Sequence, residues 1–241
     1  MAGTRRAARS DVGRPRSGVP DRPDLSASEQ ILDAAGRLFV ERGYSATTTR
    51  AIADAVGIRQ ASLYYHFATK ERLLDVLLLR TVQPSMTMAA RLADADGPAA
   101  VRLFALIAYD AGQLATAPHN VGTLYLLPEA RAAQFGRFHE ERQGLRAVYA
   151  ALIARTLDER ADARAVPDGD RTAAVVFGLV ESIIAIRADH PEEDPGALVA
   201  LVARSALRVL GFGDRELEAV AVSGHDLLEA LEQSGPGVTP A

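Results

Sequence analysis

Residues 47–74 read TTTRAIADAVGIRQASLYYHFATKERLL, which predicts two short helices joined by a tight turn and followed by the start of a third. Thr47 is expected to cap the first helix, because its hydroxyl can accept a hydrogen bond from an unpaired N–H in the first turn. Gly57 is expected to end that helix, since glycine adopts positive φ without strain. Two helices around a short glycine-containing turn form a helix-turn-helix, whose second helix enters the major groove of DNA.

The second short helix is expected from about Arg59 to Phe67, with Leu63 and Phe67 facing inward because they lie one turn apart. Its other face carries side chains that suit nucleic acid, since arginine and glutamine can pair with base edges and serine and tyrosine can reach bases or phosphates. The expected DNA contacts on this helix are Arg59, Gln60, Ala61, Ser62, Tyr64, Tyr65 and His66. The alternative is a helical hairpin with a solvated polar face, because the generic motif has many false positives.

The detailed sequence separates these alternatives. Gly43 and Tyr44, then TTTRAIADAVGI, then SLYYHFATKERLL resemble the DNA-binding domain of the TetR family of bacterial transcriptional regulators, over about residues 28–79. The resemblance implies that the second short helix reads an operator, through Arg59, Gln60, Ala61, Ser62 and Tyr64. The phosphate contacts that it implies are Thr49, Tyr65, His66 and Lys70. Thr47 and Arg50 complete the residues expected at the DNA. Ile58 departs from the small residue or serine that many members have there, which leaves the first base contact open.

The expected fold is all-α, with a three-helix N-terminal helix-turn-helix head joined to a larger helical domain for ligand binding and dimerisation. The expected segments are a disordered basic arm, the head, the helical domain and a partly loose C-terminal extension, at residues 1–24, 25–80, 81–212 and 213–241. Ser26 and Glu29 form a capping box that starts the first helix. Pro84 is expected to kink or end the helix that links head and second domain. Two short helices, at 215–222 and 226–233, are expected in the extension.

Composition narrows the class of protein. The chain is 48% hydrophobic and 24% charged, as in ordinary globular proteins, and it lacks cysteine, which excludes disulfides and thiol chemistry. It shows no apolar run long enough to span a membrane and no apolar signal region, so we expect a cytoplasmic protein with no membrane partner. The net charge is −4, with +3 over residues 1–24, +1 over 25–80 and −8 over 81–241. The positive balance therefore lies where DNA would bind, and the arm either enters a minor groove or stays solvated.

Two helices of the second domain, at about residues 171–188 and 197–210, are apolar on more than one face. Such helices need partners on more than one face, so we expect them to serve both the core and a second subunit. The resemblance implies the same homodimer, in which these helices form a four-helix bundle with those of the partner. Two heads about one DNA turn apart (~34–36 Å, or a multiple) would then read a two-fold-related operator. The alternative is a monomer with a well-packed helical core.

No pattern in the sequence indicates catalysis. The run that starts at His139 lacks the second histidine of a zinc-protease helix, and no nucleophile elbow, P-loop or dinucleotide fingerprint is present. His119 and His139 have no ligand spacing that supports a metal site. We therefore expect no enzyme activity, no metal and no cofactor.

The resemblance implies instead that a small molecule binds within the helical domain and favours a form that no longer fits the operator. The candidate lining residues, each with core packing as the alternative, are Met88, Phe104, Tyr109, Tyr125, Phe138, Tyr149, Phe177 and Glu181. Glu181 is the most informative, because a carboxylate in an apolar helix needs a partner: a second subunit, a ligand, or an arginine such as Arg187 or Arg146. The sequence thus predicts a repressor released by a small molecule. The alternatives are a constitutive DNA-binding regulator whose second domain only dimerises, and an activator.

Overall fold

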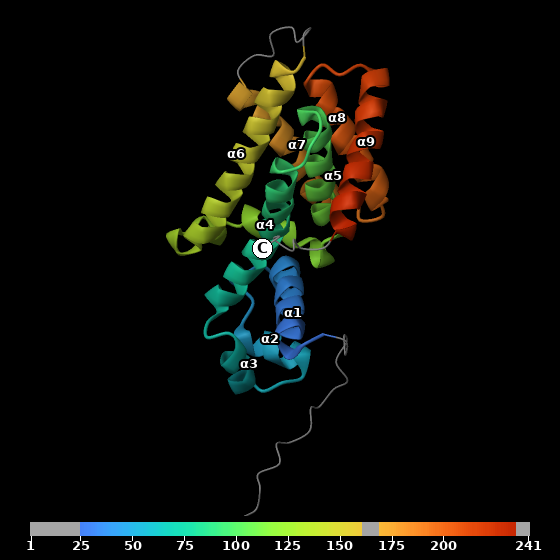
Figure 1. Ribbon diagram of the computed structural model, residues 1–241. Helices are drawn as coiled ribbons and strands as arrows, with labels where there is room; N and C mark the ends of the chain where they lie inside the picture. The colour runs from blue at the N-terminus through green and yellow to red at the C-terminus, as the bar shows by residue number, and fades with distance from the viewer. Residues whose placement is uncertain (1–24, 161–168, 235–241) are drawn as a thin grey trace, which may run out of the picture.

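The computed structural model describes residues 25–160 and 169–234, which are helical and contain no strand, so the all-α prediction is confirmed for this part of the chain. The expected basic arm and the end of the expected C-terminal extension lie outside the described residues. Figure 1 shows a small head and a larger helical body connected by one long helix. None of the described helices combines the length and the apolar character that crossing a bilayer requires.

The head contains three helices, α1 (Ala27–Arg42), α2 (Thr49–Val56) and α3 (Gln60–His66). The capping box at the start of α1 forms as predicted: the Ser26 hydroxyl accepts from the Glu29 N–H, and the Glu29 carboxylate accepts from the Ser26 N–H. Gly57 ends α2 in the left-handed region, at φ 72° and ψ 30°, again as predicted. Leu63 is fully buried and α3 packs on α2, which fixes the outward face of α3.

The cap of α2 differs from the prediction by one residue. Thr48 caps this helix, and its hydroxyl accepts from the Ala51 N–H at 3.1 Å. Thr47 is only 1% exposed, and its hydroxyl donates to the carbonyl oxygens of Leu38 at 3.0 Å and Gly43 at 2.8 Å. Thr47 therefore ties the loop to the end of α1, and its use as the helix cap was wrong.

The long helix α4 (Lys70–Ala93) passes through Pro84 without ending. Proline removes one backbone donor, at a cost of about 3 kcal/mol in an isolated helix interior. Val82, Ser85 and Met88 are buried on either side of Pro84, so the packing of α4 against α5 and α6 continues across it. Tertiary burial thus offsets the local helix-breaking signal, and α4 links the head to the body as one element (Figure 1).

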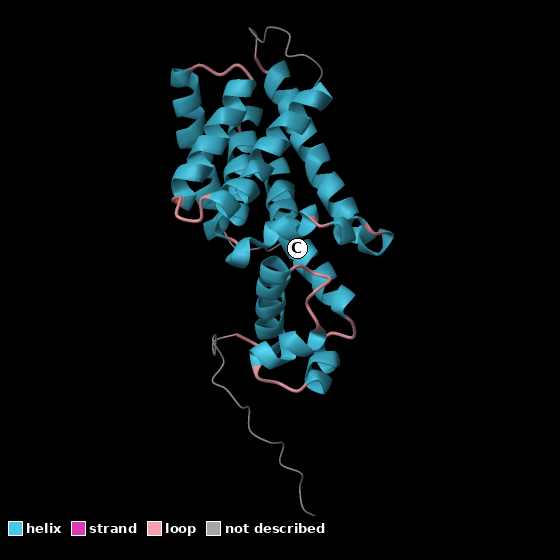
Figure 2. Cartoon of the chain, turned by 180° about the vertical axis from the view of Figure 1, so that it is seen from behind, coloured by secondary structure: helices cyan, strands magenta, loops and turns pink. Residues whose placement is uncertain are grey.

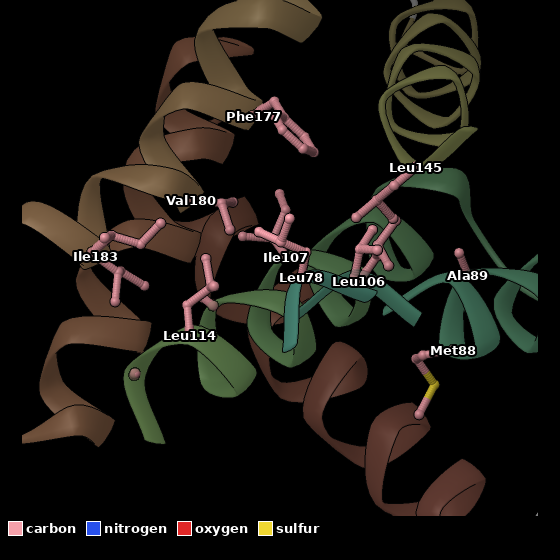
Figure 3. Packing of buried hydrophobic residues seen from close by; sticks show 14 of the residues in the cluster. Leu78, Met88, Ala89, Leu106, Ile107, Leu114, Leu145, Phe177, Val180 and Ile183 are labelled. Carbon is pink, nitrogen blue, oxygen red and sulfur yellow. The ribbon is translucent and has the colours of Figure 1, made fainter. Parts of the chain in front are cut away.

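The body is built around α5 (Ala99–Thr116), which packs against α4, α6 (Gly136–Asp158), α7 (Gly169–Asp189), α8 (Pro195–Val209) and α9 (Asp214–Gln233). Most of the α5 residues are buried, as the apolar composition of this helix requires. Side chains from α4, α5, α6 and α7 converge on one core in Figure 3, where the labelled residues include Leu78, Ile107, Leu145 and Val180.

Short 3-10 helices connect α5 to α6, with bounds η1 (Pro118–Leu126), η2 (Pro128–Arg131) and η3 (Ala133–Phe135). The long helix α6 therefore begins only at Gly136. The C-terminal extension also differs from the prediction, because α9 is one continuous helix in place of two short ones. It packs on α5 through Leu217, Ala221 and Gly224, which places it in the core of the body.

Candidate nucleic-acid interface and ligand cavity

The outward face of α3 is the first candidate site. Leu63 and Phe67 anchor this helix in the head, and Figure 2 shows α3 at the end of the molecule far from the body. Seven consecutive or near-consecutive residues on it are exposed, as the sequence predicted: Arg59, Gln60, Ala61, Ser62, Tyr64, Tyr65 and His66. Tyr65 is the extreme case, with 88% of its surface exposed. A large aromatic side chain held this far out is available to a partner surface.

Thr49 contacts two of the residues that the sequence predicts to read bases. Its hydroxyl accepts a hydrogen bond from Gln60 Nε2 at 2.9 Å and lies 3.0 Å from the Tyr64 hydroxyl. The first residue of α2 is thereby joined to two residues of α3, which orients both side chains before any ligand arrives. The Gln60 amide keeps one N–H and its carbonyl oxygen for a base edge. Thr49 is half-buried between the two helices, so it lies beside the interface that the sequence predicted.

Lys70 lies at the first turn of α4. The sequence predicted only a phosphate contact for its ammonium group, but the group also binds carbonyl oxygens of the head. Nζ donates to the carbonyl oxygens of Tyr44 at 2.9 Å and Thr47 at 3.0 Å, and it lies 4.2 Å from the centre of the Tyr44 ring. Burial raises the pKa of Tyr44 to about 12, so the ring beneath the ammonium stays neutral. Two of three ammonium donors thus hold the loop before α2, and the third is available for a phosphate.

The remaining residues predicted at the DNA fall into two groups. Arg50 is exposed beside Asp54, and His66 Nδ1 lies 3.1 Å from the Ser28 hydroxyl at the start of α1. Both lie on the outer surface of the head. Thr47 does not, because its hydroxyl is buried and both of its acceptors are carbonyl groups of the head. A DNA contact by the Thr47 side chain was therefore a wrong prediction.

The second candidate site is a cavity inside the body, between α4, α5, η1, α6 and α7, with a volume of about 20 Å³. Four of the eight predicted lining residues meet there: Tyr125, Phe138, Phe177 and Glu181. Such a volume holds about one water molecule. An organic ligand can therefore enter only if the surrounding helices move apart.

Two polar groups line the cavity, the buried carboxyl of Asp110 and the ion pair of Glu181 with Arg142. Asp110 is buried and accepts from the Ser85 hydroxyl at 2.8 Å and the Tyr149 hydroxyl at 2.9 Å, and burial raises the pKa of its carboxyl to about 6. Glu181 accepts from Arg142, with Nε at 3.0 Å. The arginine partner of Glu181 is thus Arg142, and the suggested Arg187 and Arg146 were wrong.

The two arginines suggested for Glu181 have other contacts. Arg187 donates to the carbonyl oxygens of Leu114 at 2.6 Å and Ala117 at 3.0 Å, and Arg146 lies 5.4 Å from the centre of the Phe177 ring. Asp110 and Arg142 were missed from the sequence. Asp110 could have been found from the sequence. It lies in the apolar segment 99–116, and a carboxylate in an apolar helix needs a partner, as was argued for Glu181.

The other four predicted lining residues lie outside this cavity. Tyr149 is the nearest, because its hydroxyl bonds to Asp110 and its ring meets Phe177 edge to face at 5.3 Å. Phe104 packs against His225 of α9, with ring centres 5.1 Å apart. Met88 belongs to the buried core on α4, and Figure 3 shows it well apart from Phe177. Tyr109 is half-buried, and burial raises its pKa. Met88, Phe104 and Tyr109 therefore serve packing, the alternative weighed for each.

The described residues hold no group of three or more histidine, aspartate and glutamate side chains placed to bind a metal ion. His119 lies 3.0 Å from Asp33 of α1, measured from Nε2 to Oδ1. This pair joins η1 of the body to α1 of the head. His119 therefore has a structural contact, which its position in the sequence did not indicate.

Apolar side chains also reach solvent on the outer side of the body. Val175 of α7 and Leu201 of α8 are 53% and 58% exposed, and Val209 and Val222 are exposed as well. Small residues are also exposed along α7, namely Ala174, Gly178 and Ala185, and they keep its outer face smooth. A smooth apolar helix face of this kind allows a second helix to approach closely.

Comparison with known proteins identifies relatives of both parts. Residues 31–77 match the family model described as bacterial regulatory proteins, tetR family. The HTH-type transcriptional repressor KstR2 of Rhodococcus jostii is 55% identical over 49 residues, which are 20% of this chain and 24% of that protein. The Staphylococcus aureus regulator IcaR, named as a negative regulator of the biofilm operon icaADBC, is 47% identical over 47 residues, 20% of this chain and 25% of its own. The chain thus spans about a quarter of the length of these curated relatives.

Solved structures extend the similarity to the body. The crystal structure of Mycobacterium smegmatis AmtR is 43% identical, covers 88% of this chain and 98% of its own, and superposes with a TM-score of 0.80. AibR, solved in complex with isovaleryl coenzyme A and operator DNA, shares the fold with a TM-score of 0.62 at 17% identity, over 75% of this chain and 97% of its own. The similarity to AmtR therefore covers head and body together.

Proposed function

The chain belongs to the TetR family of bacterial regulatory proteins, and from this premise we propose that it is a homodimeric repressor released from a two-fold-related operator by a small molecule. The family consists of transcriptional regulators and not of enzymes, which confirms that expectation for this chain. The observation that carries the proposal is the exposed face of α3, where Thr49 holds Gln60 and Tyr64 in place. We propose that it works in the cytoplasm, where a bacterial regulator meets its DNA.

We assign two roles to the residues on the head. Arg59 and Gln60, at the start of α3, read bases, because long polar side chains at the beginning of a recognition helix reach base edges. Tyr65, His66 and Lys70 contact phosphates, which fix the position of the protein without reading sequence. The 25–80 segment acts as the DNA-binding domain, and 81–212 acts as the effector and dimer domain. The α9 helix strengthens the core of that second domain.

Gln60→Ala is expected to cost about 1–3 kcal/mol at particular base pairs and to relax selectivity there. Tyr65→Phe is the contrasting variant, because loss of a phosphate contact weakens binding to all sequences about equally. Gel-shift titrations at fixed salt, against the DNA upstream of the coding region and single-base variants of it, measure both. A uniform loss of affinity in Gln60→Ala would contradict its role as a base reader. A complex that random DNA competes away would contradict specific regulation altogether.

The dimer that we propose forms through α7 and α8, whose outer faces carry Val175 and Leu201. Leu201→Glu is expected to shift the protein to monomers, because it places a charge in an apolar contact without a partner. Val222→Glu is the matched control, since Val222 is 54% exposed on α9, outside the proposed contact. Light scattering coupled to size exclusion measures the mass of each. Dissociation by Val222→Glu with Leu201→Glu still dimeric would move the interface to α9.

The effector site that we propose is the cavity around Asp110 and Glu181. AibR, a protein of the same fold, has been solved in complex with a ligand and operator DNA together. Because the cavity volume is only about 20 Å³, an effector must bind an expanded form of the body. A ligand that prefers this form shifts the population toward it, and by reciprocity DNA weakens the binding of the ligand.

The alternative is a constitutive DNA-binding regulator whose body only dimerises. It predicts that no small molecule raises the melting temperature of the protein, whereas an effector that binds the folded state raises it. The cavity around Asp110 and Glu181 favours a regulator that is controlled by an effector. Its lining combines three aromatic rings with the Arg142–Glu181 pair and the buried carboxyl of Asp110. Aromatic walls and a few directed polar groups are the usual make-up of a ligand site.

A further inference from the structure

We propose that a second small-molecule site lies between the head and the body, and that it takes an amphipathic molecule with one carboxylate and a short apolar chain. The site is a cavity of about 350 Å³, bounded by α1, α4, the end of α5 and η1. Ligand pockets usually have volumes of about 300–1,000 Å³. Both views show α1 lying beneath the body beside α4, where this junction is found (Figures 1 and 2). The site adjoins the proposed effector cavity, since Thr81 and Leu114 line both, but only the junction cavity is also lined by residues of α1.

The two sides of the junction cavity belong to different parts of the molecule. Asp33 of α1 and His119 of η1 close one edge with their 3.0 Å contact. Gly36 of α1 lets η1 approach closely, because a Cβ at this position would lie 3.1 Å from Val121 Cγ1. A molecule in the cavity therefore touches head and body at once. Its binding changes how the two are held together.

The wall on the body side is firmly held. Arg187 of α7 donates to the carbonyl oxygens of Leu114 and Ala117, at the point where α5 turns into η1. His119 and Asn120 follow with φ of 56° and 51°, a left-handed conformation that costs non-glycine residues energy. Asn120 Nδ2 donates to the Ile184 carbonyl at 2.9 Å, which helps to hold this conformation. The junction cavity is thus connected through η1 to α7, one of the two helices of the proposed dimer contact.

The polar groups of the cavity indicate the charge of its occupant. The two acids are already engaged: Glu29 accepts from the Ser26 N–H at 3.0 Å and hydroxyl at 2.7 Å, and Asp33 contacts His119. Hydrogen bonds from Ser26 lower the pKa of Glu29, with a smaller contribution from the nearby charge of Arg80. Arg80 and Gln113 line the cavity, and their side chains form no hydrogen bond and no close ion pair with another residue that the structure describes. A guanidinium and an amide with unused donors match a carboxylate, and arginine binds this group in a bidentate manner.

The rest of the lining is suited to a hydrocarbon chain. Apolar side chains from both parts of the molecule form it: Leu25, Leu32, Leu77, Leu114 and Val121. The two hydroxyl groups on the lining are turned to the backbone, since Thr81 donates to the Leu78 carbonyl at 2.6 Å and Thr116 to the Gly112 carbonyl at 2.8 Å. An apolar chain can therefore lie against this wall while its carboxylate meets Arg80.

Calorimetric titration of the full chain with octanoate tests the proposal without DNA. Octanoate is expected to give a saturable binding heat, and 1-octanol, which has the same chain length and no charge, is expected to bind at least tenfold more weakly. Arg80→Gln is expected to lower the affinity for octanoate about tenfold, the loss of one charge-assisted hydrogen bond. Arg37→Gln is the matched control, because Arg37 lies on α1, next to Gly36 of the lining, but pairs with Glu41 outside the cavity. It is expected to leave the affinity unchanged.

A reporter in the cavity locates the bound molecule. The chain contains no tryptophan, so Thr116→Trp introduces a single one at an exposed position on the rim. Octanoate is expected to change its emission saturably, and the change is expected to weaken in the Arg80→Gln background. Absence of saturable binding, equal binding of octanol, or equal losses in the Arg80 and Arg37 variants would overturn the proposal. Because DNA is absent, either result is independent of the proposed operator binding.

Discussion

Replacing Gly224 by alanine is expected to destabilise the folded protein by about 1–3 kcal/mol, although alanine is the better helix former. A Cβ at position 224 would lie 2.5 Å from Phe104 Cδ1 and 3.2 Å from Cγ. Phe104 is 1% exposed and packs against the His225 ring, so it has no free space into which to move. The change therefore forces α9 away from α5. Urea denaturation followed by circular dichroism measures the loss.

Gly112→Ala is the matched control for this prediction. Gly112 lies within α5, and no atom comes within 4 Å of the Cβ that alanine would add. The helix propensity of alanine then acts alone, so this variant is expected to gain up to about 1 kcal/mol. Phe104→Leu combined with Gly224→Ala is expected to recover part of the loss, because the smaller side chain relieves the overlap. A Gly224→Ala protein as stable as the wild type would show that α9 does not pack tightly on α5.

The sequence predicted the head well because its signals are local. The capping box at Ser26, the left-handed Gly57 and the inward Leu63 each depend on residues a few positions away. Whether Thr47 or Thr48 caps α2 depends on contacts with residues outside the cap. Three threonines follow one another, and the contacts of Thr47 with carbonyl groups of α1 and the following turn decide which one is free to cap.

The body was predicted as helices but not as a set of contacts. Glu181 was correctly expected to need a partner, yet Arg142 is 39 residues away, and only the packing of α6 against α7 brings them together. Helical periodicity shows which face of a helix is buried and does not show which helix covers it. The same limit explains why Pro84 did not end α4, since burial on both sides of it depends on α5 and α6.

Asp110→Asn is expected to remove a pH dependence of about 3 kcal/mol from the free energy of unfolding. The pKa of Asp110 rises from 3.8 to about 6, chiefly because the carboxyl is buried. Between these two values the folded protein binds one more proton than the unfolded chain. The stabilising contribution of Asp110 is therefore complete below about pH 4 and is lost as the pH rises through about 6. Asparagine is neutral, so it shows no such loss.

The quantity to measure is the difference between the wild-type and Asp110→Asn unfolding free energies from pH 4 to pH 7.5. The difference isolates Asp110, because Glu71 and Glu129, whose pKa values are lowered by hydrogen bonds, act in the opposite direction in both proteins. Asparagine can still pair with the Ser85 and Tyr149 hydroxyls, so the packing is preserved. If the two proteins lose stability in parallel as the pH changes, the pKa of Asp110 is not raised, and water reaches its carboxyl in the free protein. A convergence at low pH would instead show that the proposed effector cavity holds a strained, dehydrated carboxylate at neutral pH, which an effector with a hydrogen-bond donor would stabilise.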